Sequence, residues 1–224
     1  MHKPAEFYLM GYIARYNQSV GIRYVVGIDE AGRGALAGPV CVGAVLYPLD
    51  FDWREAFALV TKKGKPKLRD SKQLSAQQRD VLYEYIAAHG RLKHAAAFVS
   101  AEIIDAIGIV NAAHEAAAVA MSKLGVEPGR VAVLLDSGLR VPRIWEQESF
   151  IRGDETIPAI SCASIVAKVT RDRHMEEMSE RYRAYGFERH KGYGTQEHLK
   201  KIRSDGLSSF HRVTFCTNFS SVPD

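Results

Sequence analysis

Residues 24–40 (YVVGIDEAGRGALAGPV) constrain the fold of this chain more than any other stretch. The segment opens with an apolar run typical of a buried strand, and the run ends in two adjacent carboxylates, Asp29 and Glu30. Because side chains along a strand alternate between its two faces, we expect both acids to serve one site only if the strand ends there. A turn at Gly32 and Gly34 would then let the Glu30 side chain face the same site as Asp29. The alternative is an Asp-Glu pair that opens a solvated loop.

Further apolar runs predict how the rest of the chain folds. Residues 39–48 follow the turn so closely that they predict a second strand, antiparallel to the first. Strands are also predicted over 92–99 and 131–135, and they alternate with helices over 75–86, 111–124, 161–182 and 195–205. This order predicts an α/β domain whose sheet mixes antiparallel and parallel pairs. Active sites of such sheets lie at the carboxyl ends of strands, where Asp29 and Asp136 are expected.

Composition places the chain among ordinary globular proteins. It has 224 residues, 46% hydrophobic and 25% charged, which excludes the disordered and fibrous classes and is enough for one domain with a substantial core. Its three cysteines show no Cys-x-x-Cys spacing, so neither a disulfide framework nor a zinc site is indicated. The first 20 residues lack the continuous apolar core of a signal peptide, and no stretch is long enough to span a membrane. We therefore expect a cytoplasmic protein.

Positive charge is concentrated towards the C-terminus. Residues 168–212 contain 11 Lys and Arg against 7 Asp and Glu, an excess equal to the net charge of +4 for the whole chain. Two interpretations remain open for this segment. It can form solvated helix faces crossed by ion pairs, or a basic wall along a nucleic acid.

Four acids are candidates for a common metal site. Asp29 and Glu30 end one predicted strand, Asp136 ends another, and Asp154 follows Gly153 before a long helix. Carboxylate oxygens without histidine or cysteine favour Mg²⁺ or Mn²⁺ over zinc. Mutual repulsion makes such a cluster costly unless a cation neutralises it, which is the physical reason to expect a metal. Taken singly, Asp136 and Asp154 can also be ordinary turn residues.

A series of motifs resembles bacterial ribonuclease HII. The motifs are GIDEAGRG at 27–34, LAGPV at 36–40, DSK at 70–72, RGD at 152–154, ASIVAKVTRD at 163–172, HKGY at 190–193 and HR at 211–212. They occur in the order of that family and cover roughly residues 24–215. Two positions depart from its usual pattern, since Ala35 stands where proline is common and Ser137 separates Asp136 from Gly138.

The resemblance implies a fold and an activity. The fold is ribonuclease H-like, with a mixed central sheet flanked by helices and a C-terminal helical segment. A leader (1–23), a catalytic domain (24–215) and a tail (216–224) are expected. The implied activity is endonucleolytic hydrolysis of the RNA strand of RNA–DNA hybrids, with cutting 5′ of ribonucleotides embedded in duplex DNA. Hydrolysis by two metal ions, Mg²⁺ or Mn²⁺, would leave 3′-hydroxyl and 5′-phosphate ends.

The resemblance also implies roles for individual residues. The catalytic metal ligands are expected to be Asp29, Glu30, Asp136 and Asp154. Gly32, Arg33 and Gly34 are expected to recognise the RNA–DNA junction and its 2′-hydroxyl, and Tyr193 to read the substrate. Candidates for phosphate contacts are Lys72, Lys168, Lys191 and Arg171, for which a solvated helix face is the alternative. His190 and His211 are interpreted as helix-end or loop partners rather than catalysts.

Two competing functions follow from the same residues. Another ribonuclease H-like nuclease or strand-transferase would share the carboxylates and metals but act on DNA. A non-catalytic nucleic-acid-binding module would need only the basic segment, although acids along its nucleic-acid path would weaken binding. The expected partners are an RNA–DNA hybrid and a DNA duplex containing ribonucleotides, with no membrane, and a monomeric protein is expected.

Overall fold

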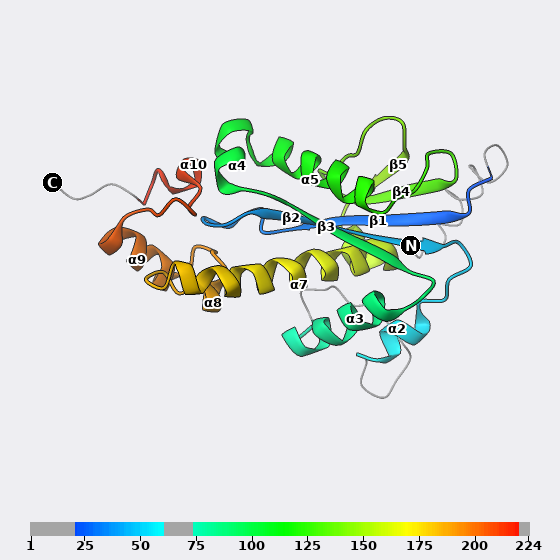
Figure 1. Ribbon diagram of the computed structural model, residues 1–224, viewed down its shortest axis with the longest axis horizontal. Helices are drawn as coiled ribbons and strands as arrows, with labels where there is room; N and C mark the ends of the chain where they lie inside the picture. The colour runs from blue at the N-terminus through cyan, green and yellow to red at the C-terminus, as the bar shows by residue number, and fades with distance from the viewer. Residues whose placement is uncertain (1–20, 61–73, 220–224) are drawn as a thin grey trace, which may run out of the picture.

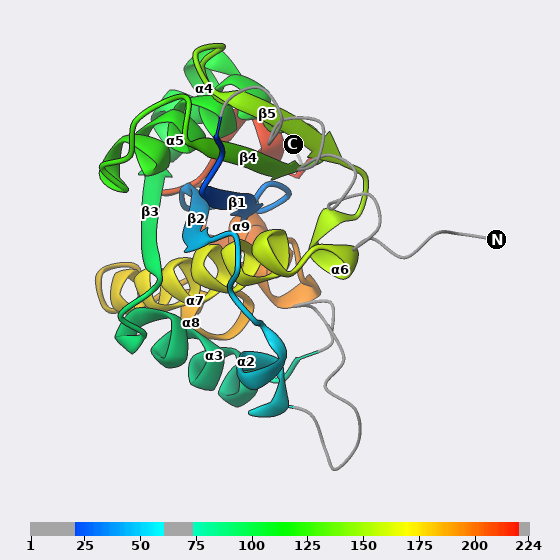
Figure 2. The same cartoon turned by 90° about the vertical axis from the view of Figure 1, so that its right-hand side faces the viewer.

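The computed structural model describes residues 21–60 and 74–219 and shows a mixed sheet between two layers of helices (Figures 1 and 2). The described strands are β1 (Tyr24–Ala31), β2 (Val40–Pro48), β3 (Lys93–Val99), β4 (Val131–Asp136) and β5 (Glu146–Phe150). The longer described helices are α3 (Ala76–Ala88), α4 (Ala101–Ile107), α5 (Ile109–Lys123), α7 (Pro158–Arg181) and α9 (Gln196–Asp205). Short helices are α2 (Arg54–Ala58), α6 (Gly153–Thr156), α8 (Phe187–His190) and α10 (Val213–Cys216).

The sheet has the strand order β3-β2-β1-β4-β5. β1 pairs antiparallel with β2 and parallel with β4, so the predicted mixed sheet and its first antiparallel pair are confirmed. The sequence prediction missed β5, which runs parallel to β4 at the edge of the sheet. Its sequence, EQESF, carries no apolar run because an edge strand buries little of its surface.

Helices cover both faces of the sheet and bury two apolar cores. α7 crosses one face with α2 and α3 outside it, and α4 and α5 cover the other face (Figure 2). α7 lies unusually close to β1, because a Cβ atom at Gly27 would come within 2.1 Å of the Ala159 carbonyl oxygen. The lack of a side chain at this one position therefore lets α7 pack directly on the central strand.

Predicted helix boundaries agree with the structure at some ends and not at others. Ser75 and Thr195, the first residues of two predicted helices, are the N-caps of α3 and α9, and Ser75 forms a complete capping box with Gln78. The long helix was predicted from residue 161, but α7 begins at Pro158, which suits the first helical turn because proline lacks an amide hydrogen. α8, α9 and α10 gather at one end of the molecule, at the left of Figure 1.

Two further observations concern the class of protein. Cys41, Cys162 and Cys216 are buried free thiols. Within residues 21–60 and 74–219, no helix combines the length and apolar character needed to cross a membrane.

Candidate active site

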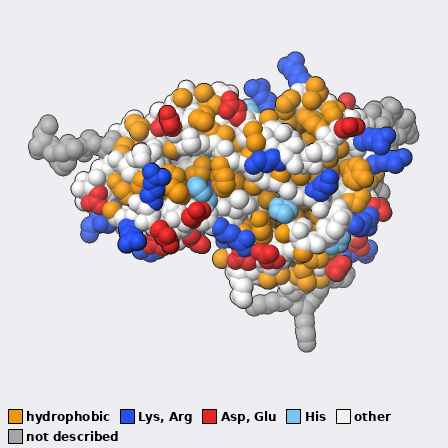
Figure 3. Space-filling model, in the orientation of Figure 1, with side chains coloured by type: hydrophobic (Ala, Val, Ile, Leu, Met, Phe, Trp, Pro, Cys, Tyr) orange, Lys and Arg blue, Asp and Glu red, His pale blue; other side chains and the backbone are white. Residues whose placement is uncertain are grey.

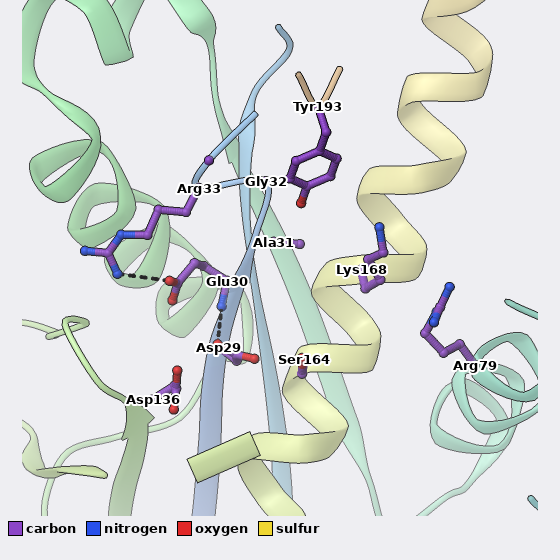
Figure 4. A pocket seen from close by; sticks show the side chains of 11 residues that line it. Asp29, Glu30, Ala31, Gly32, Arg33, Arg79, Asp136, Ser164, Lys168 and Tyr193 are labelled. Carbon is purple, nitrogen blue, oxygen red and sulfur yellow. Dashed lines mark hydrogen bonds and ion pairs between the residues drawn. The ribbon is translucent and has the colours of Figure 1, made fainter. Parts of the chain in front are cut away.

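The two adjacent acids lie on β1 itself, beyond the point where its partner β4 stops pairing. The parallel pairing ends at Ile28 with Leu135, whereas the antiparallel pairing with β2 continues through Asp29 and Glu30 to Ala31. The strand thus ends one residue beyond the predicted Asp29-Glu30 end, at Ala31, because β2 continues to pair with it. Asp29 and Glu30 still border one pocket, since the edge of β1 that faced β4 is open there (Figure 4).

This pocket has a volume of about 470 Å³ and brings together residues from distant parts of the chain (Figure 4). Its lining residues are Asp29, Glu30, Ala31, Gly32, Arg33, Gly34, Arg79, Asp136, Ser164, Lys168 and Tyr193. Three of the four predicted acids are among them, with the whole Gly-Arg-Gly turn and the predicted tyrosine. Arg79 and Ser164 were not predicted as site residues. Ser164 belongs to a motif that signalled the family, whereas Arg79 of α3 carries no sequence signal.

The carboxylates of this pocket are electrostatically unfavourable to one another. Asp29 is only 5% exposed, and burial, followed by the charges of Glu30 and Asp136, raises its pKa well above the ordinary value. A hydrogen bond with Ser164 opposes that increase. Burial also raises the pKa of Glu30. The hydrogen bond and the charge of Arg33 oppose this increase, and the charge of Asp136 adds to it. Burial and mutual repulsion thus make it costly for these carboxylates to be ionised together.

Hydrogen bonds show how the acids are engaged. Arg33 donates through Nη1 to Glu30 Oε1 at 3.0 Å, and the backbone N–H of Gly153 donates to Asp136 Oδ1 at 2.8 Å. The second Glu30 oxygen, Oε2, is buried without a hydrogen-bond partner. Within the described residues, no three side chains of Asp, Glu, His or Cys converge closely enough to hold a metal ion in this conformation.

Asp154 differs from the other three acids in lying on a short helix rather than on a strand. It is buried in α6, which begins just after Arg152, a residue with a left-handed backbone (φ 56°). The preceding Gly153 joins this segment to β4 through its contact with Asp136. Asp154 is not among the residues that line the pocket, and its role as a ligand stays a prediction.

Two buried arginines hold the Gly-Arg-Gly turn against the loop that carries Tyr193. Arg171 donates to the carbonyl oxygens of Pro39, Lys191 and Ala37 at 2.9, 3.0 and 3.2 Å. Arg212 donates to the carbonyl oxygens of Gly38 and Arg33 at 2.9 and 3.0 Å. Because Arg171 is fully buried and directed at the backbone, the prediction that it contacts phosphate is wrong.

Gly32 is the position where this packing leaves no room for a side chain. Its φ is +85°, and a Cβ atom there would lie 2.0 Å from Nε of Arg171. Gly34 differs, because it is exposed and a Cβ atom would meet nothing within 4 Å. The glycine at 32 is therefore explained by the folded protein, whereas the glycine at 34 is not.

The remaining predicted contacts are distributed around the pocket. Tyr193 is half-buried, and Lys168 Nζ lies 5.6 Å from the centre of its ring. Lys168 also pairs with Asp172 at 2.8 Å, and Lys191 pairs with Glu176 at 2.7 Å outside the pocket lining. Lys72 lies outside the described residues. On the face shown in Figure 3, basic and acidic side chains are interspersed rather than gathered into one basic patch.

Several of the Lys and Arg side chains in the basic segment 168–212 are engaged in ion pairs. Beyond Lys168 and Lys191, Arg173 pairs with Asp80 and Glu84, Arg189 with Glu188 and Glu197, and Lys201 with Asp205. Such exposed pairs contribute little stability and can be exchanged for other anions. The two interpretations of this segment are therefore compatible.

Comparison with known proteins identifies the family. The family model for ribonuclease HII matches residues 26–218. Ribonuclease HII of Bacillus cereus (strain Q1) is 42% identical over 195 residues, which cover 87% of this chain and 70% of the relative.

Solved structures share the fold. Ribonuclease H2 from Pyrococcus horikoshii OT3 superposes with a TM-score of 0.68 at 23% identity, covering 88% of this chain and 97% of the other. Bst-RNase HIII in complex with Mn²⁺ superposes with a TM-score of 0.60 at 18% identity, covering 92% and 67%. The ribonuclease H-like fold is thus confirmed, and the chain belongs to the ribonuclease HII family of endoribonucleases, which hydrolyse RNA in RNA–DNA hybrids.

Proposed function

We propose that this enzyme cuts 5′ of ribonucleotides embedded in duplex DNA, as well as within the RNA strand of longer hybrids. One observation carries this proposal, namely that acids, the Gly-Arg-Gly turn and Tyr193 line the same pocket. The acids offer a hydrolytic site, and the turn and the tyrosine offer groups that can read the sugar next to it. The 2′-hydroxyl distinguishes RNA from DNA at a single residue, so a reader of that group is what such cutting needs.

We further propose that Asp29, Glu30, Asp136 and Asp154 hold two divalent ions, Mg²⁺ or Mn²⁺. The residues suit such ions in three respects: their donors are hard oxygens, Glu30 Oε2 is buried without a partner, and Asp29 is crowded by like charge. A divalent ion bound here would supply positive charge that activates water and stabilises the charge developing on the scissile phosphate. Glu30 can offer Oε2 to such an ion while Oε1 keeps its ion pair with Arg33.

The residues around the acids then position the substrate. Gly34 is exposed and uncrowded, so its backbone can approach a ribose closely. Tyr193 presents a ring beside Lys168, which suits a sugar or base stacked near a phosphate. Arg33 is partly exposed and uses only Nη1 in its ion pair with Glu30, so its guanidinium group can also donate to the oxygens of a phosphate.

An assay with three duplexes tests the proposal. One carries a single ribonucleotide in DNA, one is a long RNA–DNA hybrid, and one is all DNA; each is incubated with Mg²⁺ and with Mn²⁺. We expect the first two to be cut, with 3′-hydroxyl and 5′-phosphate ends, and the third to remain intact. Cutting of the all-DNA duplex would indicate a DNA nuclease of the same fold. If the long hybrid is cut but the duplex with a single ribonucleotide is not, the proposal that the enzyme recognises a single 2′-hydroxyl is overturned.

We also propose that the enzyme works as a monomer in the cytoplasm, with residues 24–215 as its catalytic domain. The buried free thiols are compatible with a reducing compartment. Light scattering of the active enzyme would check the monomeric state, and a stable dimer would contradict it.

A further inference from the structure

Three buried histidines lie beneath Tyr193, and the proposed hydrolysis does not use them. His190 ends α8, His198 lies in the first turn of α9, and His211 precedes α10. All three are at least 92% buried, and the rings of His190 and His198 stack with their centres 4.4 Å apart. Polar rings are buried at a cost unless their nitrogens are hydrogen-bonded, so the partners of each nitrogen matter.

The partners of two rings fix where their protons sit. Nδ1 of His211 is 3.0 Å from the backbone N–H of Ser208, which can only donate, so this nitrogen accepts and the proton of the neutral ring lies on Nε2. That Nε2 is 3.0 Å from Nε2 of His198 and donates to it. The proton of His198 therefore lies on Nδ1, which is 3.0 Å from the carbonyl oxygen of Tyr193, an obligate acceptor. The hydrogen bonds run in one direction from Ser208 to Tyr193.

The third ring follows the same logic on the other side of Tyr193. Nδ1 of His190 accepts from the backbone N–H of Gly192 at 3.3 Å, so its proton lies on Nε2 and is donated to the carbonyl oxygen of Tyr185 at 2.9 Å. The backbone N–H of Tyr193 in turn donates to the carbonyl oxygen of His190 at 2.9 Å. Both peptide groups of Tyr193 are thus held by segments that the histidines tie down.

The surroundings keep the two linked rings neutral. Burial lowers the pKa of His198 and of His211 to about 4, and a neighbouring histidine adds to the effect in each case. The rings of Phe187, Tyr185 and His190 pack against them. A neutral ring can donate from one nitrogen and accept at the other, which a continuous chain of hydrogen bonds requires.

We propose that His211 and His198 form a hydrogen-bonded relay with fixed tautomers that positions Tyr193 for reading the ribonucleotide. His198 and His211 are positioning residues, and they act on cleavage only through the place of the Tyr193 backbone and ring. The inference rests on the proposed function, because it needs Tyr193 to contact substrate. A group displaced by about 1 Å can cost up to roughly 100-fold in rate, so a loosened Tyr193 loop should be measurable.

Two variants of one residue separate the two hydrogen bonds of His198. In His198→Asn the side-chain amide nitrogen stands near the place of Nδ1, so it keeps the bond to Tyr193 and loses the bond to His211. In His198→Gln the amide stands near the place of Nε2, so it keeps His211 and loses Tyr193. Each variant breaks one bond, and both should lose similar stability. His94→Gln on β3, away from the loop, is the control for a histidine replacement.

The measurement is kcat/KM on the duplex with a single ribonucleotide. We expect His198→Gln to lose on the order of 10-fold and His198→Asn to stay within about 3-fold of the wild type. In a Tyr193→Ala background, His198→Gln should cause no further loss, because the relay acts through Tyr193. Equal activities of the two variants, or a loss that persists without Tyr193, would overturn the inference.

Nuclear magnetic resonance of the ¹⁵N-histidine wild-type enzyme supplies a test that needs no variant. Long-range ¹H–¹⁵N correlations should place the proton on Nε2 of His211 and of His190 and on Nδ1 of His198. A proton on Nε2 of His198 would refute the relay even if the His198 variants fail to fold. Failure of the proposed function would look different, since the wild-type enzyme would then leave the single-ribonucleotide duplex intact.

Discussion

Two neighbouring regions of this molecule treat buried polar groups in opposite ways. In the acid pocket, Glu30 Oε2 has no hydrogen-bond partner, and burial and like charge raise the pKa of Asp29. In the loop support beneath Tyr193, all six ring nitrogens of His190, His198 and His211 have a partner. The unsatisfied region is suited to binding a cation, whereas the satisfied region is suited to fixing a position. Removing a charge from the acid pocket should therefore stabilise the metal-free protein, whereas changing the loop support should destabilise it.

The largest expected effect comes from the acid pocket. Asp136→Asn removes a charge but leaves an oxygen that can still accept the hydrogen bond from Gly153, so the fold should persist. We expect cleavage with Mg²⁺ to fall on the order of 10³-fold, because several kcal/mol of charge stabilisation depend on the ion held there. Steady-state rates with circular dichroism of the same samples measure both parts. Near-normal activity of the folded variant would remove Asp136 from the catalytic site.

A pair of glycine variants separates the packing of the Gly-Arg-Gly turn on Arg171 from its approach to the substrate. Gly32→Ala places a Cβ atom 2.0 Å from Arg171 Nε at a positive φ, so we expect a loss of roughly 3 kcal/mol in unfolding free energy. Gly34→Ala meets open space and should change stability by less than about 0.5 kcal/mol. If backbone approach to the 2′-hydroxyl matters, Gly34→Ala should nevertheless weaken cutting at a single ribonucleotide. Denaturant unfolding and cleavage assays on both variants separate the two effects, and a stable Gly32→Ala would contradict the packing.

The sequence predicted the acid pocket better than the loop support. Asp29 and Asp136 follow apolar runs, and strand ends in an α/β sheet have a known common edge, so local patterns sufficed. The role of Arg171 could not be predicted, because a basic residue on a helix looks the same whether it faces solvent or reaches backbone carbonyls 132 and 134 residues away. The link between His198 and His211 likewise depends on how α9 packs on the next segment.

Other misses have a similar physical origin. β5 is polar because it lies at an edge, so no periodic pattern signalled it. The continuation of β1 through Ala31 depends on pairing with Cys41 of β2, which a single segment does not reveal. Arg79 joins the pocket from α3, far along the chain from the other lining residues. Tertiary pairing decides each of these features, and local propensity does not.

A smaller effect of opposite sign is expected from relieving the acid pocket. Asp29→Asn removes a charge that burial disfavours and that Glu30 and Asp136 repel, so without metal the variant should be more stable than the wild type. Thermal unfolding in a chelator measures this. Addition of Mg²⁺ should raise the unfolding temperature of the wild type through binding to the folded state, and should do so less for the variant. A destabilised Asp29→Asn would show that the pocket is not under electrostatic stress.

The last prediction concerns pH and sharpens the contrast between the regions. His198 and His211 have folded pKa values of about 4, whereas an unperturbed histidine titrates near about 6.5. Between these values the unfolded chain binds more protons, so each ring makes stability fall as the pH falls from about 6.5 to about 4, by up to about 1.4 kcal/mol per pH unit. Acid has the reverse effect on Asp29, whose protonation relieves repulsion.

Comparing two proteins isolates the histidine contribution, because the carboxylates are the same in both and cancel. His198→Asn lacks one titrating ring, so its stability should fall less steeply with acid than that of the wild type between pH 6.5 and 4, and in parallel with it above this window. Urea unfolding at closely spaced pH values measures the difference. Parallel curves throughout would mean that His198 titrates normally, and the buried neutral ring required by its bonds to Tyr193 and His211 would then be excluded.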